Sequence, residues 1–236
     1  MKGTKNPINF FKTWKFRKKN KMKDFPFYGI RAYMGEFGSG KSLSSVNFCY
    51  DACLDYPKAI FITNTTIKGV KNETYFFSGA SELINVLQNV LSEKNKNGYI
   101  IFIDEMHVVL SDLFNQSNPI FLAYLSQLRK LGVVIVGTCQ LYNKCPKVVR
   151  DYLRLSGQII FCHKILPGVT LNRYVDMETC SENSSLKLDY KLHHIDWFFH
   201  TVEMYQCYDT HALIGQIKSL INNSKGVNEN GLSTVN

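Results

Sequence analysis

No apolar run in this sequence reaches the roughly 20 residues that a helix needs to cross a bilayer. The most apolar segment, 99–110, is interrupted by Asp104, Glu105 and His107. The start of the chain is basic and lacks the continuous apolar stretch of a secretory signal peptide. We therefore expect a soluble protein that has neither a signal peptide nor a transmembrane segment.

The sequence also lacks cysteines in a disulfide or metal-binding pattern. Cys49 and Cys53 would share a helix face, but no second Cys or His pair with ligand spacing follows them. The seven cysteines are odd in number and scattered, at Cys49, Cys53, Cys139, Cys145, Cys162, Cys180 and Cys207. We expect reduced and mostly buried thiols, which are typical of a cytosolic protein.

Acidic residues are missing from residues 1–23, which contain nine Lys or Arg among several aromatic residues. The remaining residues, 24–236, carry nineteen basic and nineteen acidic side chains, so the net charge of +9 belongs to this first segment. We treat residues 1–26 as a basic, aromatic arm. It could lie peripherally on an anionic membrane, follow a phosphate backbone, or be solvated.

Short apolar segments of the buried-strand type alternate with segments of helical periodicity along most of the chain. This alternation predicts an α/β fold in which helices flank a mostly parallel sheet. We expect one domain over residues 27–221, in which residues 167–221 form peripheral strands or a small subdomain. Residues 222–236 have almost no apolar content and predict a disordered tail. The predicted strands are 28–34, 59–63, 99–103, 133–138 and 158–162.

Residues 35–42 read GEFGSGKS and match the pattern G-x-x-x-x-G-K-[ST] between a predicted strand and a predicted helix. Glycines in such a loop let backbone N–H groups wrap phosphate oxygens, and the following helix presents its positive end to them. Lys41 is expected to reach the β and γ phosphates of ATP, and Ser42 to bind Mg²⁺. The expected phosphate-binding residues are Gly35, Gly38, Ser39, Gly40, Lys41 and Ser42.

The predicted strand 99–103 is followed directly by two carboxylates, Asp104 and Glu105. In α/β proteins this edge of the sheet binds ligands. Asp104 suits Mg²⁺, with a water molecule between them. Glu105 is placed to orient or deprotonate the attacking water.

Gln140 follows the strand 133–138, and we expect it to sense the γ phosphate. A basic stretch comes next and contains Lys144, Lys147, Arg150 and Arg154. A loop there could carry these side chains to DNA phosphates, although a solvated helix face would have the same composition.

These motifs, together with residues 127–140 (QLRKLGVVIVGTCQ), resemble the FtsK–HerA superfamily of P-loop ATPases. The resemblance extends from about residue 31 to residue 161, and residues 208–210 are a further short segment of similarity. It implies a RecA-like core of the added-strand, catalytic-glutamate type. It also implies a ring of subunits, expected to be a hexamer, with DNA passing through the centre. The arginine that completes the neighbouring subunit's site would be Arg129, with Arg150 and Arg154 as alternatives.

Small members of this superfamily include viral genome-packaging ATPases and the Zot-like assembly proteins of filamentous phages. The resemblance thus implies an ATP-driven translocase that packages a viral genome into a preformed capsid, in contact with capsid or portal-vertex proteins. Such a protein would work in the host cytoplasm or remain associated with the virion.

Four other functions are consistent with part of this sequence pattern. Residues 104–107 spell D-E-x-H, a helicase motif, but such helicases need a second nucleotide-fold domain for which the chain has too few residues. A Zot-like export factor would usually carry a membrane-spanning segment after its ATPase domain. An ATP-binding switch would use the same P-loop without translocating DNA. A small-molecule kinase would require an Arg-rich lid, which is not evident.

Overall fold

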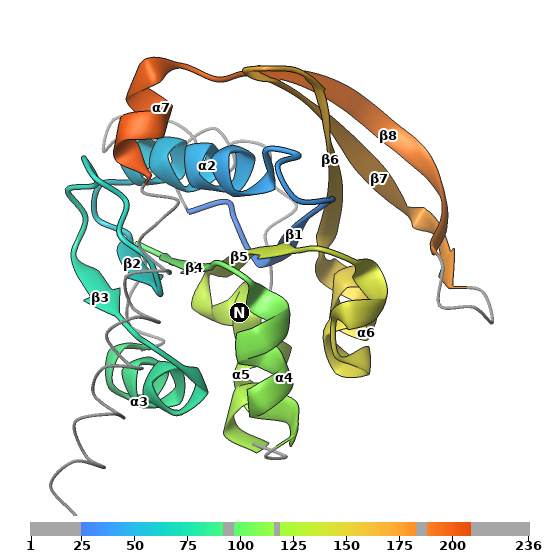
Figure 1. Cartoon of the computed structure of the whole chain (residues 1–236). Helices are drawn as coiled ribbons and strands as arrows, with labels where there is room; N and C mark the ends of the chain where they lie inside the picture. The colour runs from blue at the N-terminus through green and yellow to red at the C-terminus, as the bar shows by residue number, and fades with distance from the viewer. Residues whose placement is uncertain (1–24, 92–96, 116–118, 183–187, 209–236) are drawn as a thin grey trace, which may run out of the picture.

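The computed structural model describes residues 25–91, 97–115, 119–182 and 188–208. These segments form an eight-stranded sheet with helices on both faces (Figure 1). Its strands are β1 Gly29–Met34, β2 Ile60–Thr63, β3 Thr74–Phe76, β4 Tyr99–Ile103, β5 Val133–Cys139, β6 Gln158–Leu166, β7 Val169–Glu182 and β8 Leu188–Phe199. Its helices are α2 Lys41–Asp55, α3 Ala80–Val90, α4 Met106–Asn115, α5 Pro119–Leu131, α6 Lys147–Ser156 and α7 Val202–Cys207, with a 3₁₀ turn at Tyr142–Lys144.

The strand order is β3-β2-β4-β5-β1-β6-β7-β8. The strands from β3 to β6 pair in parallel, and β7 and β8 continue the sheet in antiparallel pairing. The predicted α/β class with a mostly parallel sheet is confirmed. In the sheet, β5 lies between β1 and β4, as expected for the added strand of the catalytic-glutamate type.

Two apolar layers hold the sheet between its helices. The strand β4 is fully buried, so its residues face the core on both sides of the sheet. Ile100 and Phe102 pack with α2 on one face, whereas Ile101 and Ile103 pack on the other face with α3, α4 and α5. Burial on both faces explains the unbroken apolar run of this strand.

The long β7–β8 hairpin continues the same sheet, and α7 follows it across the face that carries α2 (Figure 1). The described part of the region 167–221 therefore consists of the two strands that extend the main sheet and a short helix that packs against α2. The basic arm 1–26, apart from its last two residues, and the tail 222–236 lie outside the described residues, as does the segment 209–221.

We expected the basic stretch after Gln140 to form either a loop or a solvated helix face, and most of it is helical. Pro146 precedes α6, which begins at Lys147 and runs to Ser156. Proline favours this position because its missing N–H is not needed at a helix start.

All seven cysteines are free thiols, and six of them are buried. Within the residues that the structure describes, none of the helices is long and apolar enough to span a membrane.

Candidate nucleotide site

The glycine-rich segment forms a tight loop between the end of β1 and the start of α2. Gly38 and Gly40 have φ angles of 72° and 90°, which L-residues with a side chain rarely adopt. A Cβ atom at Gly40 would also collide with Oγ1 of Thr170, because β7 crosses directly beside the loop. Both constraints require glycine at residue 40. Because glycine has no side chain, it does not cap the amide groups at the start of α2.

Lys41 extends across this loop. Its side chain is buried, and its Nζ donates a hydrogen bond of 3.3 Å to the carbonyl oxygen of Glu36. The ammonium group also lies 5.5 Å from the centroid of the Phe37 ring. A buried cation held by a neutral carbonyl is well suited to receive a negatively charged ligand at this position.

The two halves of the expected site meet across the end of β5. Asp104 is buried at the end of β4, and its Oδ1 lies 3.5 Å from Oγ of Ser42, at the start of α2. The structure thus brings together the two residues expected to bind Mg²⁺, which are 62 positions apart in the chain. A carboxylate and a hydroxyl are oxygen donors of the kind that Mg²⁺ prefers, so the residues present fit this ion.

Three further residues, which the sequence reasoning did not assign to the site, hold Asp104 in place. Thr138 donates a hydrogen bond of 2.6 Å to its Oδ1, and Tyr208 donates one of 2.5 Å to its Oδ2. The side chain of Asn64 bridges its backbone, accepting from the N–H at 2.8 Å and donating to the carbonyl at 2.9 Å. Asn64 and Thr138 could have been suspected, because both lie at the carboxyl ends of strands.

Glu105 adopts an unusual backbone conformation for a residue with a side chain. Its φ angle is 53°, and its N–H donates a hydrogen bond of 2.8 Å to the Thr138 hydroxyl. Such strained conformations are often found at functional sites. The Glu105 carboxylate is half-buried, with one oxygen 3.3 Å from Nδ1 of His107.

Gln140 lies directly after β5 and faces the P-loop. It lines a cavity of about 340 Å³ together with Gly35, Phe37 and Ser39. The amide is half-buried. It therefore shares a cavity with the expected phosphate-binding loop.

Arg129 lies near the end of the sheet that is opposite to the P-loop. It precedes β5, whereas the P-loop lies beside the carboxyl end of that strand, and the seven residues of β5 span roughly 20 Å. Its guanidinium is exposed and lies 5.6 Å from the centroid of the Tyr28 ring. The structure does not bring Arg129 to the P-loop of the same chain.

Arg150 does not have the exposure that its expected roles require. It is 8% exposed, and its Nη1 donates a hydrogen bond of 2.9 Å to the carbonyl oxygen of Cys145. This side chain holds the turn before α6. The expected contact with DNA, or the role of an alternative trans-acting arginine, would require it to leave this position. Lys144, Lys147 and Arg154 are exposed.

No family model matches the chain, and no curated protein sequence matches it. Among solved structures, the N-terminal domain of zonular occludens toxin from Neisseria meningitidis matches with a TM-score of 0.50 and 19% identity, covering 77% of this chain and 99% of that domain. B204, the DNA-packaging ATPase from Sulfolobus Turreted Icosahedral Virus, matches with a TM-score of 0.46 and 12% identity, covering 70% and 98%. B204 from Sulfolobus turreted icosahedral virus 2, solved with ATP-gammaS, gives 0.48 and 12%, covering 74% and 98%. The toxin domain thus shares the fold of this chain.

Proposed function

We propose that this chain is a P-loop ATPase that couples ATP hydrolysis to the translocation of DNA during virus assembly. The observation that carries the proposal is the meeting of Ser42 and Asp104 beside the buried ammonium of Lys41. These three groups supply a hydroxyl, a carboxylate and a cation at the end of a glycine-rich loop. Together they form a site for a triphosphate and its Mg²⁺ ion.

In this proposal the amides of residues 35–40 bind the β phosphate, and Lys41 bridges the β and γ phosphates. Ser42 would bind Mg²⁺ directly, and Asp104 would bind it through water, because both Asp104 oxygens already accept protein hydrogen bonds. When bound, Mg²⁺ neutralises charge on the β- and γ-phosphate oxygens.

Glu105 is proposed to orient the attacking water and accept its proton. Its backbone has a φ angle of 53°, and its N–H is fixed by the hydrogen bond to Thr138. The carboxylate is only half-buried, which leaves it accessible to water. Gln140 is proposed to report whether the γ phosphate is present, since it lines a cavity with the P-loop.

We further propose that the ATPase domain, residues 27–221, assembles into a hexameric ring around DNA. Arg129 lies far from its own P-loop, so its catalytic role would be in the neighbouring subunit's site. A guanidinium in this role raises the hydrolysis rate by roughly 10³ to 10⁵. The exposed side chains of Lys144, Lys147 and Arg154 would contact DNA phosphates, which makes DNA affinity fall steeply with salt.

The decisive experiment measures phosphate release from ATP with and without DNA, for the wild type and for Glu105→Gln. A translocase should release phosphate faster with DNA, and Glu105→Gln should abolish release while retaining ATP binding. An ATP-binding switch would instead bind ATP without stimulation by DNA. That result would contradict the proposed motor.

A mixing experiment tests the shared site. Arg129→Ala and Lys41→Ala subunits should each be inactive alone, because each lacks one half of every site. In a mixed ring, an intact P-loop can meet an intact Arg129, so activity should partly recover. If no ratio of the two variants restores hydrolysis, sites shared through Arg129 are contradicted.

A Zot-like role in phage assembly or DNA export is the second candidate, favoured by the shared fold with the zonular occludens toxin domain. Unlike capsid packaging, this role would place the protein at a membrane. Flotation of the full chain with anionic lipid vesicles distinguishes the two. Comigration with the vesicles at physiological salt favours export, whereas binding to capsid or portal-vertex proteins without vesicles favours packaging.

A further inference from the structure

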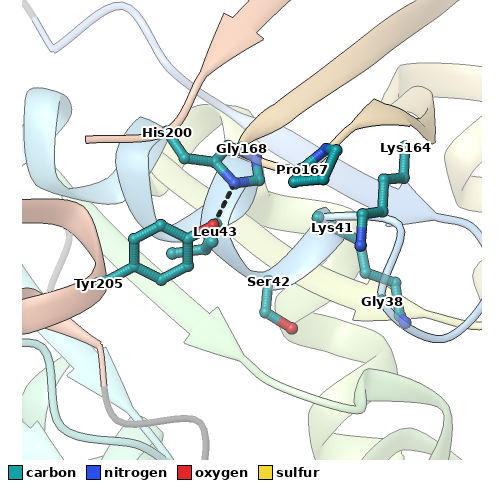
Figure 2. A pocket seen from close by; sticks show the side chains of 10 residues that line it. Gly38, Lys41, Ser42, Leu43, Lys164, Pro167, Gly168, His200 and Tyr205 are labelled. Atoms are coloured by element: carbon teal, nitrogen blue, oxygen red, sulfur yellow. Dashed lines mark hydrogen bonds between the residues drawn. The ribbon is translucent and has the colours of Figure 1, made fainter. Parts of the chain in front are cut away.

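A second cavity, of about 360 Å³, opens from the first turn of α2 (Figure 2). Its walls include Ser42 and Leu43 from α2, Lys164 and Pro167 from the end of β6 and the turn after it, and the rings of His200 and Tyr205. Its volume lies within the range of about 300–1,000 Å³ that is typical of small-molecule sites. The cavity is also lined by Gly38, Gly40 and Lys41, so it is continuous with the P-loop, and it is large enough for part of a ligand.

A chain of hydrogen bonds ties the two rings to the P-loop. The Thr170 hydroxyl must donate to the carbonyl oxygen of Ser39, at 3.1 Å, because a carbonyl can only accept. Its oxygen then accepts from Nε2–H of His200, at 2.9 Å. This leaves Nδ1 of His200 to accept from the Tyr205 hydroxyl, at 2.7 Å. One tautomer of neutral His200 satisfies every member of the chain.

The environment of His200 supports this neutral form. Burial, followed by the charge of Lys164, lowers the pKa of the imidazole below its usual value. The Thr170 side chain, on β7, is completely buried against the P-loop. The His200 and Tyr205 rings lie edge to face, with their centroids 5.6 Å apart. Both are thus held in fixed positions beside the start of α2.

The order of the strands shows which end of a nucleotide this cavity faces. Asp104 and Glu105 follow β4, the P-loop follows β1, and the cavity lies at the β6–β7 turn, in the order β4-β5-β1-β6-β7. The hydrolytic carboxylates must lie at the γ phosphate. A triphosphate that crosses the P-loop from that point therefore directs its nucleoside towards the β6–β7 turn.

We propose that this cavity binds the nucleoside half of a nucleoside triphosphate, with the rings of Tyr205 and His200 packing against the base. This inference rests on the proposed function, because the phosphates are assigned to the P-loop. Pro167 and Leu43 add apolar surface to the same cavity. Recognition is then mainly by stacking, which tolerates different bases because every base has a π face.

Two probes separate the halves of the site: ATP, and inorganic triphosphate, which has no nucleoside. Both are titrated onto the full chain with Mg²⁺ by calorimetry. Tyr205→Ala should weaken ATP binding by roughly 5- to 150-fold, the range found for loss of a base–aromatic stack. It should leave triphosphate binding unchanged. Tyr205→Phe keeps the ring and should retain most of the ATP affinity.

Two control variants distinguish a failure of the nucleoside assignment from a failure of the proposed function. Phe199→Ala removes an exposed aromatic side chain just outside the cavity and should change neither affinity. Lys41→Ala should abolish binding of both probes, and if it does not, the proposed function fails. If Lys41→Ala abolishes binding but Tyr205→Ala behaves like Phe199→Ala, the nucleoside assignment fails. Equal weakening of both probes by Tyr205→Ala also overturns it, because that effect would come from the P-loop.

Discussion

The hydroxyl of Tyr208 donates a hydrogen bond of 2.5 Å to Oδ2 of Asp104, although 104 positions separate the two residues in the chain. Tyr208 is buried directly after α7, and it is held there by a bridge to Ile67. Burial and the neighbouring Asp104 carboxylate raise the pKa of this tyrosine, so the hydroxyl keeps its proton. The segment after the β7–β8 hairpin is thereby attached to the proposed metal-binding carboxylate.

Removing this donor should destabilise the protein. Tyr208→Phe leaves one oxygen of a buried carboxylate without this partner, and a hydrogen bond to a charged group contributes roughly 1.5–3 kcal/mol. The free energy of unfolding, measured in urea, should fall by about that amount. Tyr75→Phe is the matched control, because Tyr75 donates a hydrogen bond of 2.6 Å to Glu73 in an exposed position. Equal stability of the two variants would argue against the proposed importance of the Tyr208 contact.

The Thr138 hydroxyl connects the two carboxylate residues, because it donates to Asp104 and accepts from Glu105 N–H. Thr138→Val keeps the shape but removes both hydrogen bonds, which should lower the free energy of unfolding by about 1–3 kcal/mol. A small misplacement of catalytic groups can cost on the order of 100-fold in rate, so kcat should also fall sharply. Thr138→Ser retains the hydroxyl and should recover activity. A fully active valine variant would contradict this role.

The left-handed conformation of Glu105 should cost stability. Glu105→Ala and Glu105→Gly both remove the carboxylate and should both lose hydrolysis. Only glycine adopts a φ of 53° without strain, so the glycine variant should unfold with a free energy about 1 kcal/mol higher than the alanine variant. Thermal or urea unfolding measures this difference. If alanine were the more stable variant, the backbone at this position would not be strained.

His200 should make the stability depend on pH. Its pKa is lowered in the folded protein, so below about pH 6.5 the unfolded chain binds more protons at this residue than the folded chain does. Its contribution is therefore present above pH 6.5 and is lost as the pH falls through the lowered pKa. His200→Gln should show a smaller loss of stability between pH 7 and pH 5 than the wild type. An unchanged pH profile would contradict the neutral, hydrogen-bonded histidine.

The sequence predicted those parts of the fold and site that depend on neighbouring residues. The glycine-rich loop and the Asp104–Glu105 pair each lie within one short segment, and an apolar strand next to each indicated its place in the sheet. Tyr208 and Thr170 could not be assigned in this way. Only the β7–β8 hairpin and α7 bring Thr170 to the P-loop and Tyr208 to Asp104. The burial of Arg150 was also hidden, because it depends on the turn at Cys145.

Lys41 and Glu105 are proposed to serve the same ATP site, Lys41 in binding the nucleotide and Glu105 in hydrolysing it. The most direct test measures both ATP affinity and phosphate release for the wild type, Lys41→Ala and Glu105→Gln, in the presence of Mg²⁺. We predict that Lys41→Ala loses ATP binding, whereas Glu105→Gln binds ATP with nearly wild-type affinity and releases no phosphate. Hydrolysis at the wild-type rate by Glu105→Gln, or undiminished ATP binding by Lys41→Ala, would contradict these roles.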